Sequence, residues 1–387
     1  MDHWFHQELQ LIEEKGLKRK LRAFSTGNES EVIMDGKKFL LFSSNNYLGL
    51  ATDIRLRKKA AEGISKYGTG TGGSRLITGN FVIHEQLECE IANLKETEAA
   101  IVFSSGYLAN IGVISSVMKK RDIIFSDAWN HASIIDGCRL SQANTIVYEH
   151  ADMVDLERKL SQSSGDGKKL IVTDGVFSMD GDIAPLPEIV ALAKKYSAYI
   201  MVDDAHATGV LGSDGRGTAD YFGLKDEIDF TVGTLSKAIG AEGGFVATSS
   251  IGKNYLLNNA RSFIFQTGLS PSAIEAAREG ISIIQNEPER RDQLLKNAQY
   301  LHLELEKSGF IVWGGDTPII SLLIGDSHEA IQFSEKLMDE GIFIPAIRPP
   351  TVPKGSSRLR ITVMATHTME QLNTVINKIK KIEIGVV

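Results

Sequence analysis

Two kinds of hydrophobic pattern alternate in the middle of the chain. Short runs rich in β-branched and aromatic residues have the length of strands and lie at 100–103, 123–125, 145–148, 170–173, 199–202, 230–232 and 245–248. Between them, apolar residues recur with the spacing of amphipathic helices. Strands that alternate with helices in this way are typical of βαβ units. We therefore predict an α/β fold with a mainly parallel central sheet covered by helices.

The two ends of the chain have different patterns. Residues 4–22 have the apolar spacing of an amphipathic helix that leads into the fold, and residues 38–42 resemble a short strand. Toward the C-terminus, helices and strands are expected at 272–286, 289–308, 319–323, 328–340, 359–363 and from 368. We predict an N-terminal helix and short strand segment (1–45), a large domain (46–290) and a smaller α+β C-terminal domain (291–387).

Composition and charge exclude several classes of protein. The 42 basic and 49 acidic residues give a net charge of -7, which provides no overall attraction for nucleic acid or an anionic membrane. Cys89 and Cys138 are too few for a disulfide framework or a cysteine-built metal site. The charged N-terminus does not resemble a secretion signal, and no run approaches 18 apolar residues. We expect a cytoplasmic protein without nucleic-acid, membrane or metal partners.

One glycine-rich segment matches the sequence of a dinucleotide-binding motif but lacks its structural context. The segment from Gly68 to Gly73 fits G-x-G-x-x-G. That motif must leave a strand and open a helix, whereas here a helical pattern at 55–67 runs into the glycines. The context favours a loop, either a plain one or one that approaches a ligand closely. It disfavours an oxidoreductase that binds NAD.

Two neighbouring strand ends carry residues suited to one cofactor. Asp203 and His206 follow the run 199–202, and Lys237 follows the run 230–232 on a glycine-rich turn. Taken alone, the first group is also consistent with a helix cap and a buried core histidine. Together they place an amine and a carboxylate at one sheet edge. Pyridoxal 5'-phosphate (PLP) needs an amine for a Schiff base, a carboxylate for its ring nitrogen and donors for its phosphate.

Further candidates follow other predicted strands. The amides of Gly106 and Tyr107 open a predicted helix and are suited to a phosphate, although the same position is also an ordinary helix cap. His131 opens another helix and is suited to stacking on a flat ring, or to a structural role. Ser178 lies in a turn from which it can hydrogen-bond ring substituents.

The C-terminal part adds a candidate for binding a carboxylate. Residues 346–353 contain three prolines, which make the segment stiff and extended. Arg358 and Arg360 lie on one face of the strand that follows. Either guanidinium is suited to grip a substrate carboxylate through two parallel hydrogen bonds, and a solvated edge strand is the alternative.

From about residue 16 to the end, the chain resembles the α-oxoamine synthases. These are fold-type-I PLP-dependent transferases that condense an amino acid with an acyl thioester and lose CO2. The matching segments are 43–50, 72–75, 105–107, 131–133, 173–186, 203–206 and 234–237. Within the family, 346–353 and 358–360 are most similar to the biotin-pathway branch.

The resemblance implies a role for each candidate residue. Residues expected to contact the cofactor are Gly106, Tyr107, His131, Ser178, Asp203, His206, Thr234 and Lys237. Those expected to act in catalysis are Lys237, His131, Asp203 and His206. Those expected to bind substrate are Arg19, Asn45, His131, Thr351 and Arg360, with Arg19 and Thr351 on the acyl-thioester route. Lys18, Lys20 and Arg22 are neighbours that can replace Arg19 in that role.

The biotin-pathway branch implies L-alanine and a pimeloyl thioester, carried by coenzyme A or by acyl carrier protein, as substrates. It also implies a homodimer with active sites at the interface, where residues such as Thr267 reach the cofactor phosphate of the other subunit. One alternative is a sister reaction of glycine with acetyl-CoA or another acyl-CoA. A second is a noncatalytic protein that keeps the fold as a binding or scaffold subunit. The joint presence of lysine, aspartate, both histidines and arginine argues against the second.

Overall fold

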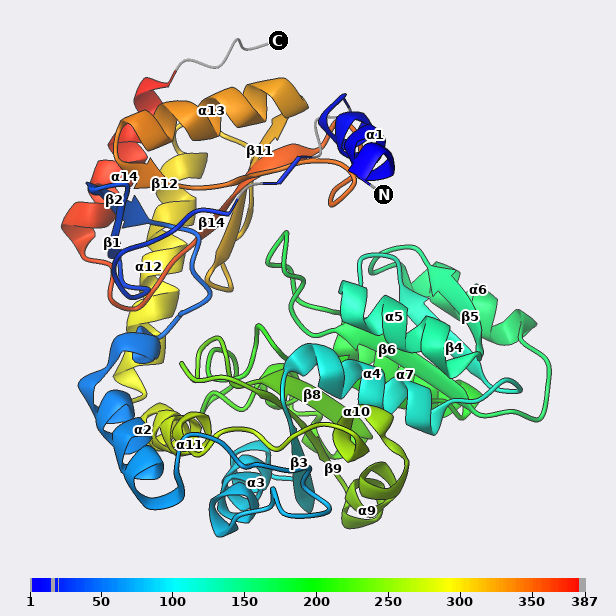
Figure 1. Cartoon of the computed structure of the whole chain (residues 1–387). Helices are drawn as coiled ribbons and strands as arrows, with labels where there is room; N and C mark the ends of the chain where they lie inside the picture. Colours follow the sequence, from blue (N-terminus) through cyan, green and yellow to red (C-terminus); the bar gives the residue numbers. More distant parts are fainter. Residues whose placement is uncertain (1, 15–17, 20, 383–387) are drawn as a thin grey trace.

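The computed structural model describes residues 2–14, 18–19 and 21–382. Figure 1 shows a large unit around the central sheet and a smaller unit that contains both the N-terminal strands and the C-terminal helices. The central sheet has seven strands in the order β3 (Ala99–Phe103), β9 (Gly244–Thr248), β8 (Phe230–Thr234), β7 (Tyr199–Asp203), β6 (Lys169–Asp174), β4 (Ile123–Asp127) and β5 (Asn144–Tyr148). Only β9 is antiparallel to its neighbours, so the predicted α/β fold is confirmed.

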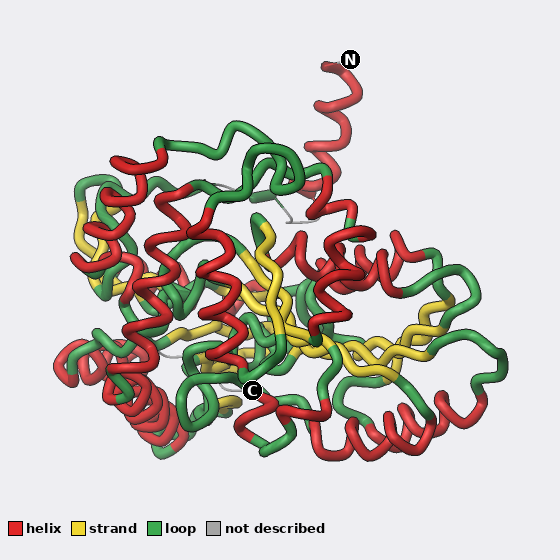
Figure 2. Tube along the Cα trace, turned by 90° about the horizontal axis from the view of Figure 1, so that it is seen from below, coloured by secondary structure: helices red, strands yellow, loops and turns green. Residues whose placement is uncertain are grey.

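Helices cover the central sheet on both faces, as Figure 2 shows from below. In the large unit they are α2 (Ile54–Tyr67), α3 (Val82–Lys95), α4 (Gly106–Val117), α5 (Ala132–Ser141), α6 (Met153–Gln162), α7 (Leu186–Tyr196), α8 (Thr218–Tyr221), α9 (Ser250–Asn259), α10 (Arg261–Ile264) and α11 (Pro271–Asn286). Six of the seven strands are buried almost throughout, because helices pack on both of their faces, whereas the edge strand β5 is largely exposed. This double burial explains why the strands appear in the sequence as continuous apolar runs.

The smaller unit is built on an antiparallel sheet with helices against it. Its strands are β10 (Val312–Gly314), β11 (Ile319–Gly325), β14 (Ser357–Thr362) and β13 (Ala346–Ile347), in that order. Its helices are α12 (Glu289–Glu306), α13 (Ser327–Asp339) and α14 (Met369–Lys381). A third sheet joins β1 (Glu31–Met34) and β2 (Lys37–Leu41) to β12 (Ile342–Phe343), so the N-terminal strands pair with the C-terminal part of the chain. The three-part division of the chain stays a prediction.

The N-terminal helix differs from the prediction. Helix α1 spans Asp2–Glu14, and residues 18, 19, 21 and 22 are not helical, so the predicted helix at 4–22 is too long. Residues 15–17 and 20 lie outside the described residues. No residue of α1 is buried, and Figure 2 shows the helix extending away from the rest of the chain. The apolar spacing therefore predicted a helix correctly, but not its packing against the fold. No helix in the described part of the chain is long and apolar enough to cross a membrane.

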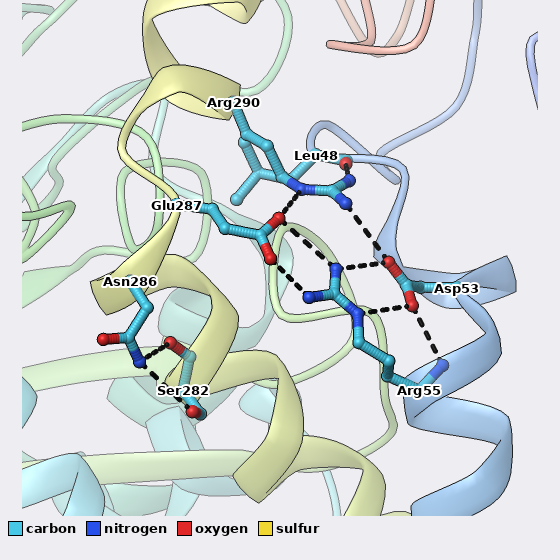
Figure 3. A network of polar contacts seen from close by, with 7 residues as sticks. All are labelled: Leu48, Asp53, Arg55, Ser282, Asn286, Glu287 and Arg290. Carbon is cyan, nitrogen blue, oxygen red and sulfur yellow. Dashed lines mark hydrogen bonds and ion pairs between the residues drawn. The ribbon is translucent and has the colours of Figure 1, made fainter.

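A network of charged side chains fixes the point where the chain passes from the large to the smaller unit (Figure 3). Glu287, at the end of α11, pairs with Arg55 and accepts a hydrogen bond from Arg290 Nε at 2.6 Å. Asp53, which caps α2, pairs with the same two arginines at 2.9 and 3.2 Å. Arg290 also donates to the carbonyl of Leu48. The network ties α11 and α12 to residues 48–55.

We expect Glu287→Gln to weaken this junction most at neutral pH. Hydrogen bonds from Arg55 and Arg290 lower the pKa of Glu287 from 4.5 to about 2. The carboxylate therefore contributes stability above pH 4.5 and loses it as the pH falls toward 2. The variant should lose about 1–2 kcal/mol of unfolding free energy at pH 7, and less near pH 3, in urea unfolding curves. Glu8→Gln, at an exposed position of α1, is the control. An equal loss at both pH values would contradict the expectation.

Candidate active site

Several predicted site residues meet at the carboxyl edge of the central sheet. His131 follows β4, Asp203 ends β7 and Thr234 ends β8, with Lys237 three residues further on. These side chains line one cavity of about 260 Å³. The other residues that line it are Ser105, Gly106, Tyr107, Asn110, Ser133, Asp174, Ser178, Ala205, His206 and Ser236. The cavity thus brings together all the residues expected to contact the cofactor.

A chain of hydrogen bonds starts at the amine of Lys237. Its Nζ lies 2.9 Å from His206 Nε2, and His206 Nδ1 lies 2.6 Å from the hydroxyl of Tyr47. Burial, together with the charge of Lys237, holds the pKa of His206 well below its usual value, so the imidazole is neutral. Burial also lowers the pKa of Lys237 to about 8, although Asp203 and Asp174 act in the opposite direction. A fraction of the lysine amine is therefore uncharged near neutral pH.

The carboxylate of Asp203 is buried and held in a fixed orientation. Its Oδ2 accepts a hydrogen bond from Asn110 Nδ2 at 2.6 Å, and its Oδ1 accepts one from the amide of Ala205 at 3.0 Å. Asn110 projects from α4 and also donates to Ser133 Oγ. A carboxylate with this support is suited to hold one cationic group in the cavity.

His131 caps helix α5 and is tied to the neighbouring strand. Its amide donates to Asp174 Oδ2 at 2.8 Å, and its Nδ1 accepts from the amide of Ser133. This contact leaves the ring proton on Nε2 in the neutral form. Burial lowers the pKa of His131, while the charge of Asp203 opposes the change. The ring is therefore a neutral hydrogen-bond donor at one side of the cavity.

The opposite end of the cavity is suited to an anion. Gly106 and Tyr107 are the first residues of α4, where backbone amides have no acceptor within the helix. The hydroxyls of Thr234 and Ser236 lie 2.6 Å apart beside them. A Cβ atom on Gly244 would come 2.3 Å from the amide nitrogen of Gly106, so only glycine lets β9 approach this helix end.

These residues fit the predicted cofactor, because the cavity contains the three groups that PLP needs. Lys237 provides the amine, Asp203 the carboxylate, and the start of α4 with Thr234 the phosphate donors. The individual roles stay predictions. Sequence reasoning missed Tyr47, Asn110, Ser133, Asp174 and Ser236, which support or line the same cavity. Asp174 has a signal in the sequence, since it ends β6 in the way that Asp203 ends β7.

The two arginines on β14 have different surroundings. Arg360 donates to the carbonyl of Ser178 and, through Nη2, to Asn45 Oδ1 at 3.2 Å. Asn45 Oδ1 in turn lies 3.2 Å from the hydroxyl of Tyr47. Arg358 forms a buried ion pair with Asp180 and lies over the ring of Trp313. Arg360 therefore joins the contacts around the cavity, whereas Arg358 is engaged elsewhere.

A larger cavity of about 650 Å³ adjoins the first one. The residues that line it are Ala128, Trp129, Asn130, His131, Ala132, Ile135, Phe177, Ser178, Met179, Asp180, Pro350, Thr351, Val352 and Pro353. His131 and Ser178 line both cavities. Thr351 thus lines the larger cavity, and its role on the acyl-thioester route stays a prediction. Arg19 is exposed and is not among the described residues that line either cavity.

We expect the amine of Lys237 to react with acetic anhydride at lower pH than other lysines in cofactor-free protein. Its modification should be half-maximal near pH 8, as its pKa of about 8 requires. Lys59, whose pKa is raised by a hydrogen bond to Glu62, is the control and should react only at higher pH. Because the charge of Asp203 raises the pKa of Lys237, Asp203→Asn should move the midpoint below 8. Peptide mass spectrometry measures both sites, and equal midpoints would contradict the expectation.

Comparisons with known proteins identify the family and the fold of the chain. The family model "Aminotransferase class I and II" matches residues 37–379. The chain is 84% identical to an 8-amino-7-oxononanoate synthase of Lysinibacillus sphaericus over the full length of both chains. Two solved structures have similar folds. A serine palmitoyltransferase from S. paucimobilis with bound PLP and myriocin has a TM-score of 0.92 and 35% identity, covering 97% of this chain and 96% of that one.

The second structure is an 8-amino-7-oxononanoate synthase from Francisella tularensis. It has a TM-score of 0.77 and 30% identity, covering 89% of this chain and 97% of that one. The family and the fold type predicted from the motifs are thereby confirmed. The chain belongs to the aminotransferase class I and II family and, within it, to the α-oxoamine synthases.

Proposed function

We propose that this chain is a PLP-dependent enzyme of biotin synthesis. It condenses L-alanine with a pimeloyl thioester to give 8-amino-7-oxononanoate, CO2 and the free thiol. The observation that carries this proposal is the pair of adjoining cavities: one contains Lys237 and Asp203, the other is larger, and His131 and Ser178 line both. An amino acid held in the first cavity meets an acyl group held in the second at these shared residues. The 84% identity to an 8-amino-7-oxononanoate synthase supports the choice of substrates.

In this proposal the smaller cavity holds the cofactor. Lys237 would bind it covalently, the carboxylate of Asp203 would pair with its ring nitrogen, and His131 would stack on its ring. The amides at the start of α4 and the hydroxyl of Thr234 would hold its phosphate. When bound, PLP takes up the electron pair left at Cα after loss of a proton or of CO2. Asp203 keeps the ring nitrogen protonated and so favours this charge transfer.

The chain's own groups position the amino acid and move its proton. Arg360, which Asn45 helps to orient, pairs with the carboxylate of L-alanine. Once the amino group of L-alanine has replaced it on the cofactor, the freed amine of Lys237 would remove the proton from Cα, and its lowered pKa provides the uncharged form that this step requires. His206, which is neutral and 2.9 Å from the amine, keeps Lys237 oriented without adding positive charge. His131 donates a hydrogen bond to the acyl carbonyl as charge develops on its oxygen.

The larger cavity suits an acyl chain. Trp129, Ile135 and Val352 give it apolar walls, and Thr351 lies beside them. Its acidic group, Asp180, is neutralised by Arg358. The chain of the thioester therefore enters without facing an unpaired charge. We propose coenzyme A or acyl carrier protein as the carrier, and a cytoplasmic homodimer as the assembly.

The experiment that tests this function is a visible absorption titration of the purified holoenzyme. A cofactor band that changes with L-alanine, and CO2 release on addition of pimeloyl-CoA, are the expected results. Glycine in place of alanine, with acetyl-CoA, is the comparison reaction. A response to glycine and acetyl-CoA alone would move the function to the sister reaction. A protein without a cofactor band after reconstitution with PLP would overturn the proposal.

We expect Asp203→Asn to keep the fold and lose most turnover. An opposite charge close to a titrating group shifts its pKa by roughly 1–3 units, and each unit corresponds to about 1.4 kcal/mol. Turnover should therefore fall roughly 10- to 1000-fold. Steady-state assays with L-alanine and pimeloyl-CoA measure the loss, with circular dichroism as the test of folding. Asp339→Asn, at the exposed end of α13, is the control. Near-normal turnover in the Asp203 variant would exclude it as the partner of the ring nitrogen.

A further inference from the structure

A histidine outside the smaller cavity is held between two carboxylates. His150 Nδ1 lies 3.0 Å from Asp127 Oδ1, and His150 Nε2 lies 2.9 Å from Asp182 Oδ2. Asp127 is buried at the end of β4, and Asp182 belongs to the turn that also carries Ser178. Burial lowers the pKa of His150, but the hydrogen bonds to both carboxylates outweigh this effect and raise it to about 9. The imidazole is therefore a cation that links two separate segments at neutral pH.

The same imidazole supports two walls of the larger cavity. The indole of Trp129 stacks on it with ring centres 3.7 Å apart and an angle of 11° between the planes. The ring of Phe177 meets it edge-on at 4.4 Å. Both Trp129 and Phe177 line the larger cavity. Trp129 is 40% exposed, so surrounding packing alone does not fix its indole. The cationic imidazole of His150, stacked on the indole, adds an attraction that holds Trp129 in place.

The backbone around Asp127 is arranged to keep this stack in place. Asp127 accepts hydrogen bonds from the amide of Trp129 at 2.8 Å and from the amide of Ala151 at 2.9 Å. Ala151 adopts a φ of 52°, in the left-handed region that is unfavourable for alanine. The carboxylate of Asp127 therefore fixes both Trp129, which stacks on the imidazole, and the loop that carries His150.

We propose that His150 is a positioning residue for the acyl thioester: clamped between Asp127 and Asp182, it holds the indole of Trp129 as a wall of the larger cavity. The inference rests on the proposed function, since it assigns the larger cavity to the acyl group. His150 touches neither substrate nor cofactor in this role. Its effect on the reaction passes through Trp129, so it should concern binding of the thioester and leave binding of alanine unchanged.

Steady-state kinetics of the holoenzyme test the proposal. His150→Gln should raise the KM for pimeloyl-CoA roughly 10- to 100-fold, as expected when a positioning contact is lost. The KM for L-alanine and the absorption band of the cofactor should not change. His328→Gln, at an exposed position of α13, is the matched control. An unchanged KM for the thioester would overturn the proposal, as would an equal rise in both KM values.

A double-mutant cycle tests whether His150 affects binding of the thioester through Trp129. If His150 acts through Trp129, the double variant His150→Gln with Trp129→Ala should bind the thioester no more weakly than Trp129→Ala alone. Additive losses would show that His150 acts by another route and would overturn the proposal. If His150→Gln does not fold, Asp182→Asn takes its place, because it removes the charge of one partner and keeps a side chain of similar shape.

Fluorescence separates this proposal from the proposed reaction. With Trp4 and Trp313 replaced by phenylalanine, the emission comes from Trp129. Pimeloyl-CoA added without alanine should change that emission in a saturable way, and His150→Gln should raise the half-saturating concentration. If emission changes in a saturable way but the protein does not turn over alanine, the proposed reaction is refuted and the role of Trp129 as a wall of the larger cavity is retained. If the protein turns over alanine but the emission does not change, the role of Trp129 as a wall is refuted and the proposed reaction is retained.

Discussion

The site depends on how two buried carboxylates are accommodated at one edge of the sheet. Asp174 and Asp203 end adjacent parallel strands and are paired in register, so neither can move away from the other. Burial, and then the charge of Asp203, raise the pKa of Asp174 well above its usual range. Asp174 therefore gives up its proton less readily than an ordinary carboxyl, while the carboxyl of Asp203 accepts hydrogen bonds from Asn110 and from the amide of Ala205. The sheet edge thus presents a fixed Asp203 side chain in the same cavity as Lys237.

The same strand pairing explains which parts of the site were predictable from the sequence. Asp203, Lys237 and His131 follow apolar runs directly, and the carboxyl ends of parallel strands always meet at one edge. Asn110 lies inside a helix and Tyr47 in an irregular segment, so no periodic pattern indicated that they reach the cavity. Their places are set by packing between distant parts of the chain.

The fold shows the same division between local and distant information. Most strands of the central sheet were predictable because they are buried on both faces, although the edge strand β5 is largely exposed. Strands β12 and β13 have two residues each and exist through pairing with β2 and β14, which no local pattern indicates. The N-terminal helix shows the reverse case, since its spacing is amphipathic and yet none of its residues is buried. Periodicity predicts conformation, whereas burial depends on what the rest of the chain brings near.

The turn around Ser178 connects the two units of the chain to the chemistry. It leaves the central sheet, but its carbonyl groups accept hydrogen bonds from Thr317, Ser321 and Arg360 of the smaller unit. Arginine has five N–H groups, so Arg360 can hold this turn and still bind a carboxylate. Because Ser178 lines both cavities, a displacement of β14 moves the guanidinium of Arg360 and the boundary between the cavities together. The smaller unit therefore helps to set the geometry in which the amino acid meets the acyl group.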